Sequence, residues 1–89
     1  MKLHKIKIKP EYYALLDVGI KTFELRENDR DYQVGDSIQF TIIFENGRLL
    51  EIDQKYIITY VLKDVEKYGL KKDYCIFSLK KVVGNLWII

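Results

Sequence analysis

The stretch Gly19-Ile-Lys-Thr-Phe-Glu-Leu-Arg-Glu-Asn-Asp-Arg-Asp-Tyr-Gln-Val-Gly-Asp36 is the most polar and most specifically ordered part of this 89-residue chain. It combines lysine, arginine, glutamate, aspartate and asparagine side chains, begins with a glycine and has a second glycine just before its end. Only a few apolar positions interrupt it. Its charges therefore form either a binding or reactive site, or a solvated strand and loop.

Residues 21–26 alternate between polar and apolar side chains, as a half-buried β-strand does. The pattern predicts that Phe23 and Leu25 enter the core, so Glu24 and Arg26 would lie side by side on the opposite surface. In the strict alternation of a strand, Lys21 would lie on the same face as Phe23 and Leu25, away from that surface. It stands at the expected turn between a helix and this strand, where parity is a weak guide.

The residues before this stretch predict a strand followed by a short helix. Residues 4–9 alternate, with His4 on the same face as two isoleucines, which favours a structural, hydrogen-bonded histidine. Pro10 fits the first turn of a helix, and Gly19 fits its C-terminal cap. The apolar spacing predicts that the buried face of this helix carries Tyr12, Leu15 and Leu16.

The residues after it predict a long β-hairpin. Residues 27–33 are expected to form a loop, and Val34-Gly35-Asp36 to start a strand. The turn at Asn46-Gly47 is a strong signal for a tight hairpin. The return strand spans about residues 48–62, a length that predicts a bend or bulge. Its inward residues are expected to be Leu50, Ile52, Tyr56, Ile58, Tyr60 and Leu62.

The rest of the chain adds two short strands to this pattern. Residues 64–73 read as a polar connection with one helical turn, residues 74–79 as a strand, and Leu86–Ile89 as a final strand. That last apolar segment could cap the sheet or pair with another copy, so the oligomeric state stays open. Residues 1–89 are thus expected to form a single α+β, mainly β domain. We expect a mixed barrel of five to six strands with one short N-terminal helix.

Composition narrows the possible functions. The chain is 48% hydrophobic and 31% charged, has no membrane-spanning run and starts without a signal-peptide pattern, so we expect a cytoplasmic protein with no membrane partner. Cys75 lies among apolar residues and is expected to be buried. One cysteine and one histidine are too few for a zinc site, and nothing indicates another metal or a cofactor.

Three functions are compatible with the charged stretch. Lys21, Arg26 and Arg30 could bind the oxygens of a nucleotide while Glu24 and Asn28 read base edges. Lys21 and Glu24 could instead be catalytic, with the carboxylate activating water for hydrolysis. As a third possibility, charged side chains of the stretch pair only with one another in a structural ion-pair network that pins a loop. Its members would be Glu24, Arg26, Asp29, Arg30 and Asp31.

The order of residues resembles a known family. Gly19-x-Lys21-Thr22-x-Glu24-x-Arg26 is similar to the Gly-x-Lys-x-x-Glu-x-Arg signature of ASCH domains, which belong to the PUA-like superfamily. Asn28-Asp29-Arg30 and Val34-Gly35-Asp36 extend the resemblance towards a compact, uncharacterised branch from bacteria and their phages.

The resemblance implies a PUA-like pseudo-barrel that binds RNA, a nucleotide or a modified nucleoside in a cleft beside the signature. The ligand-binding residues that it implies are Lys21, Glu24, Arg26, Asn28, Asp29 and Arg30.

Some ASCH relatives are enzymes, which supports the hydrolase alternative. One is an amidohydrolase that acts on acetylated cytidine; Lys21 and Arg26 match it, whereas it has a threonine at the position of Glu24. Asp64 or Glu66 could replace the later acid that assists in that enzyme.

Overall fold

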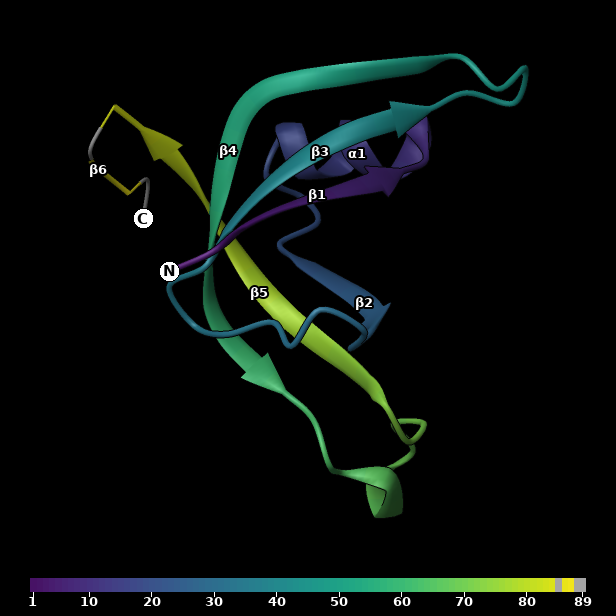
Figure 1. Ribbon diagram of the computed structural model, residues 1–89, viewed down its shortest axis with the longest axis vertical. Helices are drawn as coiled ribbons and strands as arrows, with labels where there is room; N and C mark the ends of the chain where they lie inside the picture. The colour runs from purple at the N-terminus through teal and green to yellow at the C-terminus, as the bar shows by residue number, and fades with distance from the viewer. Residues whose placement is uncertain (85, 88–89) are drawn as a thin grey trace.

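The computed structural model, which describes residues 1–84 and 86–87, is a curled mixed β-sheet with one short helix (Figure 1). Its elements in chain order are β1 (Leu3–Ile8), α1 (Pro10–Asp17), β2 (Phe23–Glu27), β3 (Ser37–Ile43), β4 (Leu49–Leu62), the 3-10 turn η1 (Glu66–Tyr68), β5 (Tyr74–Val83) and β6 (Leu86–Trp87). This confirms the expected mainly β, α+β class with one short N-terminal helix.

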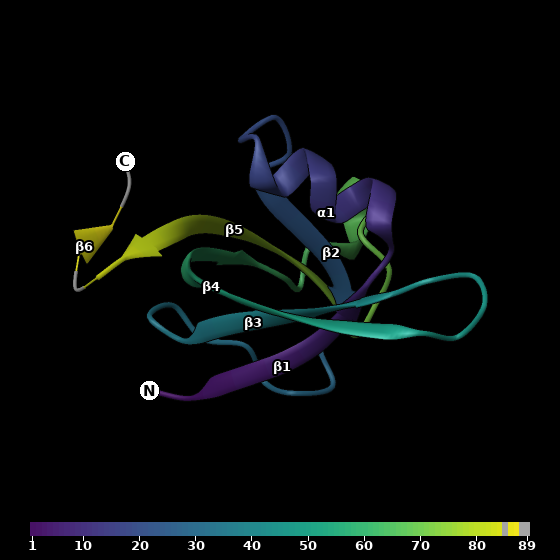
Figure 2. The ribbon, with the colours of Figure 1, turned by 90° about the horizontal axis from the view of Figure 1, so that it is seen from above.

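The sheet order is β1-β3-β4-β5-β2. β1 pairs parallel with β3, and the other neighbours pair antiparallel. Among the described residues β1 and β2 are the two edges and do not pair, so the sheet is not a closed barrel. The helix α1 packs against β3, and Figure 2 shows it on one face of the curled sheet.

The first strand follows its predicted pattern, whereas the helix is rotated from the prediction. His4, Ile6 and Ile8 are buried and face the core. In α1 the buried residues are Tyr13 and Leu16, while the exposed fractions of Tyr12 and Leu15 are 48% and 39%. The prediction of a buried Tyr12 and Leu15 was therefore wrong. Tyr13 reaches the core, where its ring packs against Phe40 at a centroid distance of 5.9 Å.

Two irregularities make β4 long and bent, as predicted. Figure 1 shows its sharp bend, and its pairing shifts opposite β3 between Gln39 and Thr41. The Gln39 side chain is buried and donates a hydrogen bond to the carbonyl of Ile52 inside this irregularity. A second shift lies between Ile58 and Tyr60.

The second shift reverses which side chains of β4 face the core. Ile58 is buried, but Tyr60 is 60% exposed and Val61 packs against the core instead. An extra residue in one strand rotates the following side chains to the other face, so the predicted inward Tyr60 was wrong. Leu50 is also exposed, so its predicted inward position was wrong as well.

The C-terminal residues fit a final strand as far as they are described. Leu86 and Trp87 pair antiparallel with Val83 and Val82 at the end of β5. Ile88 and Ile89, the rest of the predicted strand, lie outside the described residues. No helix in the described part of the chain is long and apolar enough to cross a membrane.

Asp36 joins the N-terminal strand to the start of the hairpin. It is buried, lies 2.8 Å from Nε2 of His4, and accepts hydrogen bonds from the backbone amides of Lys2 and Gln33. The preceding Gly35 has φ +93°, a backbone conformation that L side chains rarely adopt, so this tight turn favours glycine. The predicted structural role of His4 is thereby confirmed.

We expect Asp36→Asn to destabilise the protein in a pH-dependent manner. Burial alone would raise the pKa of Asp36, but hydrogen bonds from His4 and two backbone amides lower it below its usual value. A carboxylate with a lowered pKa stabilises the fold above its unfolded pKa of about 3.9, and this contribution is lost as the pH falls towards the folded value.

Urea unfolding at pH 7 and pH 3 tests this expectation. At pH 7 the variant should lose roughly 1 to 3 kcal/mol of unfolding free energy, and the difference from wild type should shrink at pH 3. An equal difference at both pH values would contradict the role of the Asp36 charge.

Candidate functional site

The strand β2 has the opposite orientation to the one predicted from its sequence. Phe23 and Leu25 are 47% and 56% exposed, whereas Glu24 is only 6% exposed and Arg26 is half-buried. The cause is the pairing with β5, in which Glu24 lies opposite the buried Phe77. The signature's charged side chains therefore face inward, and its apolar side chains face outward.

This reversal brings Lys21, Glu24 and Arg26 together. The Lys21 ammonium donates to one carboxylate oxygen of Glu24 and to the carbonyl of Phe23. The other oxygen of Glu24 accepts a hydrogen bond from Nη1 of Arg26 at 3.4 Å. Since an isolated buried carboxylate is costly, two cations beside Glu24 are what its burial requires.

Arg26 also connects the two edges of the sheet. Its Nη1 donates to the backbone carbonyl of Lys7 in β1 at 2.8 Å. β1 and β2 do not pair as strands, so this side chain bridges edges that the backbone leaves apart. The Lys21–Glu24–Arg26 cluster thus helps to close the fold, whatever else it does.

The remaining predicted site residues lie past the far end of β2. The Asn28 side-chain oxygen accepts a hydrogen bond from the backbone amide of Tyr32, which makes Asn28 a turn-forming residue. Asp29 and Arg30 are exposed and, like Asp31, have no ion-pair partner among the described residues. The structure therefore does not join these residues to Lys21 and Glu24 in one network.

Tyr32 is a buried residue of the loop that carries Asp29 and Arg30. Burial raises the pKa of Tyr32, and the nearby positive charges of Arg26 and Arg30 partly oppose that increase. Its ring packs against His4 and Phe77 at centroid distances of 4.8 and 4.7 Å. Sequence periodicity did not place this fully buried tyrosine, because it lies in a loop.

A pocket of about 420 Å³ opens beside the first part of the signature. Gly19, Lys21 and Thr22 contribute to it from the connection between α1 and β2, and the backbone amide of Leu79 in β5 binds the carbonyl of Thr22. Its complete lining is Leu16, Asp17, Val18, Gly19, Lys21, Thr22, Tyr56, Leu79, Lys80 and Lys81. Three lysines and one aspartate make this pocket positively charged.

Gly19 and Lys81 hold the end of the helix at this pocket. Gly19 has φ +81°, as expected of a residue that ends a helix, and confirms its predicted cap position. Lys81 Nζ donates to the backbone carbonyl of Asp17 at 2.6 Å and to its carboxylate at 3.0 Å. A cation at a helix C-terminus is favourable because it meets the negative end of the helix dipole.

One buried polar group of a residue at the pocket has no hydrogen-bond partner in the described part of the chain. Tyr56 is 2% exposed, and its hydroxyl makes no hydrogen bond with any described residue. Tyr13 is the neighbour that acts most on this hydroxyl, since after burial it is the largest cause of the raised pKa of Tyr56. Leaving a buried hydroxyl unsatisfied costs about 1 to 3 kcal/mol. No pattern in the sequence indicates this feature, since Tyr56 reads only as a core residue.

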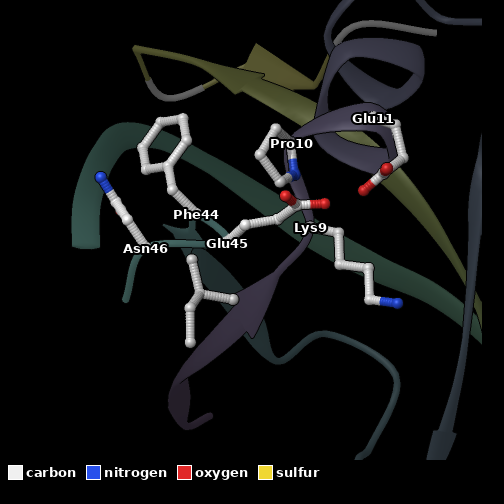
Figure 3. A pocket seen from close by; sticks show the side chains of 7 residues that line it. Lys9, Pro10, Glu11, Phe44, Glu45 and Asn46 are labelled. Carbon is white, nitrogen blue, oxygen red and sulfur yellow. The ribbon is translucent and has the colours of Figure 1, made fainter. Parts of the chain in front are cut away.

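A larger pocket of about 710 Å³ lies between the start of α1 and the tip of the β3–β4 hairpin (Figure 3). It is lined by Lys9, Pro10, Glu11, Ile43, Phe44, Glu45 and Asn46. Two carboxylates against one lysine would repel a phosphate, and no signature residue contributes. Size alone therefore does not make it the better candidate for an anionic ligand.

The structure places no assisting acid, reactive cysteine or metal site next to the signature in the described part of the chain. Asp64 and Glu66 follow the end of β4, which pairs with the start of β5 at Ile76. Lys21 lies instead beside Leu79, further along β5. Cys75 is fully buried, as predicted, and burial raises the pKa of its thiol. Within residues 1–84 and 86–87 no three His, Cys, Asp or Glu side chains are arranged to hold a metal.

Glu24→Gln should destabilise the fold far more than Leu25→Gln. Removing the carboxylate leaves Lys21 and Arg26 without their common partner, which should cost about 3 kcal/mol of unfolding free energy. Leu25 is exposed, so its substitution should change the stability by no more than about 0.5 kcal/mol. Urea unfolding of both variants decides the orientation of β2, because the opposite order would place Glu24 at the surface and Leu25 in the core.

Comparison with known protein families matches most of the chain to one family model. Residues 3–79 match the model described as "Domain of unknown function (DUF3850)". No curated protein matches the chain. The match includes the whole signature, the β3–β4 hairpin and most of β5. The chain therefore belongs to the DUF3850 family.

Proposed function

We propose that this protein binds RNA or a nucleotide in the pocket beside the Gly-x-Lys-x-x-Glu-x-Arg signature, as its resemblance to ASCH domains implies. The observation that carries the proposal is the lining of the 420 Å³ pocket, where lysines from two separate segments converge. Lys21 comes from the signature, and Lys80 and Lys81 come from β5.

The cluster behind the pocket leaves Lys21 able to contact a ligand. An ammonium has three N–H donors, and the bonds to Glu24 and to the carbonyl of Phe23 use two of them. Its nitrogen also lies 5.1 Å from the centre of the Phe23 ring. Glu24 thus fixes the position of Lys21, and one donor is left for a phosphate or a carbonyl oxygen.

Lys80 is the pocket residue whose substitution tests binding with least effect on the fold. It has no ion-pair partner among the described residues, whereas Lys21 is bound to Glu24 and Lys81 to Asp17. Its charge is therefore available to a ligand. Lys55 in β4 offers a matched control because it is exposed and lies outside the pocket lining.

We expect wild type to bind short single-stranded RNA or nucleoside monophosphates, more tightly at low than at high salt. Lys80→Ala should weaken binding about tenfold, as loss of one charge-assisted contact implies. Lys55→Ala should keep the wild-type affinity within about twofold. Fluorescence anisotropy or calorimetry at two salt concentrations measures these affinities.

Two results would contradict the proposal. One is no binding by wild type even at low salt. The other is equal weakening by Lys80→Ala and Lys55→Ala, which would indicate only non-specific attraction to a basic protein.

Hydrolysis of a modified nucleoside is a second candidate, favoured by the direct contact of Lys21 with Glu24 beside the pocket. An acid and a lysine in contact could transfer protons to a substrate. This candidate requires release of product from acylated nucleosides, lost on Lys21→Ala. A panel of such substrates without turnover by wild type would remove it.

Composition and the buried single cysteine lead us to propose the cytoplasm as the site of action. The resemblance to a branch of ASCH domains implies that this is the cytoplasm of a bacterium, or of a bacterium infected by a phage. Binding of a nucleotide is compatible with that compartment.

A further inference from the structure

Three neighbouring strands, β2, β5 and β4, carry apolar side chains on the face that turns away from the core (Figure 1). The pairing registers arrange these side chains in rows. Phe23 of β2 lies opposite Ser78 of β5, which in turn lies opposite Tyr60 of β4. The next row, which is entirely aliphatic, consists of Leu25, Ile76 and Leu62. We call these two rows the outer face.

The outer face is open in the described part of the chain. Phe23, Leu25 and Tyr60 are all exposed, although the side chains next to them in sequence, such as Glu24 and Val61, turn to the core. Single exposed apolar residues are ordinary, but a contiguous group of them indicates a surface that binds a partner. The remaining question is which kind of partner the outer face fits.

Lysines border both rings of the first row. Nζ of Lys21 lies 5.1 Å from the centre of the Phe23 ring. Lys80 follows Ser78 by two residues in β5, so it lies on the same face of the sheet. Lys63 directly follows the last residue of β4 and is exposed. Neither Lys63 nor Lys80 has an ion-pair partner among the described residues.

This composition favours a nucleic acid over a second protein surface. Phenylalanine and tyrosine are enriched in protein–protein interfaces, but lysine and serine are depleted there. Aromatic rings with lysines beside them match a single-stranded nucleic acid, because its bases stack on the rings and its phosphates attract the ammonium groups. The chemistry of the outer face therefore points to a strand of nucleotides.

The spacing of the two rings requires bases that are not paired. Neighbouring strands of a sheet lie about 4.8 Å apart, so Phe23 and Tyr60, which are two strands apart, are separated by about 10 Å. In a duplex each base is stacked on the next at about 3.4 Å and its face is covered. Only bases that have left such a stack can reach both rings.

The outer face continues into the pocket beside the signature. Lys80 belongs to both, because it lines the pocket and follows Ser78 on the outer face. Thr22 also lines the pocket and directly precedes Phe23. A nucleotide in the pocket would therefore have its neighbours in the strand over the first row.

The position of one acid gives the strand its direction across the sheet. Glu27 lies opposite Tyr74, in the row beyond the aliphatic one and away from the pocket. Phosphates are repelled by this carboxylate and attracted by Lys63 at the end of β4. The favourable path thus runs from the pocket over Phe23 and Tyr60 towards Lys63.

We propose that the outer face binds single-stranded RNA, with one base stacked on Phe23 and another on Tyr60, as a continuation of the strand that enters the pocket. This inference rests on the proposed function and specifies its ligand as a strand of several nucleotides, not a lone nucleotide.

Tyr60→Leu and Phe23→Leu test the stacking. Both side chains are exposed, so the melting temperature of each variant should stay within about 4 °C of wild type. Affinity for a single-stranded RNA of about eight nucleotides should fall at least about fivefold in each variant, as loss of one stacked base implies. Affinity for a nucleoside 5′-monophosphate, which occupies the pocket alone, should not change.

Tyr68→Leu is the matched control. Tyr68 is also exposed and also has a lysine beside its ring, with Nζ of Lys67 at 5.0 Å from the centre, but it belongs to η1 and to neither row. This variant should keep the wild-type affinity for the RNA. The same RNA annealed to its complement should bind wild type at least about fivefold more weakly, because its bases are already stacked.

The outcomes separate this inference from the proposed function. If wild type binds the monophosphate but binds the RNA no more tightly, the outer face has no role and the pocket keeps its own. If wild type binds neither, the proposed function fails. Equal affinity for single strand and duplex, or an equal loss in Tyr68→Leu, would overturn the stacking and leave only attraction between charges.

Two further results have a defined meaning. Self-association of wild type in sedimentation experiments, lost in Leu25→Gln, would assign the outer face to a second copy of the chain and overturn the proposal. If one of the two ring variants does not fold, the other still decides, because each tests a different ring.

Discussion

The buried carboxylate of Glu24 is the constraint on which the arrangement of this small domain depends. A charge in that position needs cations, and the chain supplies Lys21 from the preceding turn and Arg26 from the same strand. Arg26 then reaches the carbonyl of Lys7 and joins the two unpaired edges of the sheet. One side chain thus replaces the row of backbone hydrogen bonds that would close a barrel, and the signature acts first as part of the fold.

This structural role also shapes the candidate site. Because Glu24 holds Lys21, the loop between α1 and β2 is fixed beside β5, and a positively charged pocket forms between them. The same motif can therefore stabilise the fold and position a binding group. The structural and binding hypotheses are not exclusive for Lys21, whereas Asn28 acts in a turn and lies apart from the pocket.

Sequence patterns predicted the positions of the helix and strands well. They predicted less well which side chains of each element face the core. β1, the hairpin at Asn46-Gly47 and the buried Cys75 follow from local signals, because alternation and turn chemistry act over a few residues. Alternation in β2 identified a strand but assigned it the wrong face, since a buried ion pair outweighed the hydrophobicity of Phe23 and Leu25. The prediction that Tyr60 faces the core was wrong because a bulge in β4 reverses which side chains after it point inward. Features that depend on distant partners cannot be read from the sequence alone.

Backbone amide chemical shifts test the central claim, that the ligand site is the pocket beside the signature, most directly. In an NMR titration of wild type with a nucleoside 5′-monophosphate, we expect the largest shift changes at residues 17–22 and at Lys80 and Lys81. Changes confined to residues 9–11 and 43–46, around the larger acidic pocket, would contradict it.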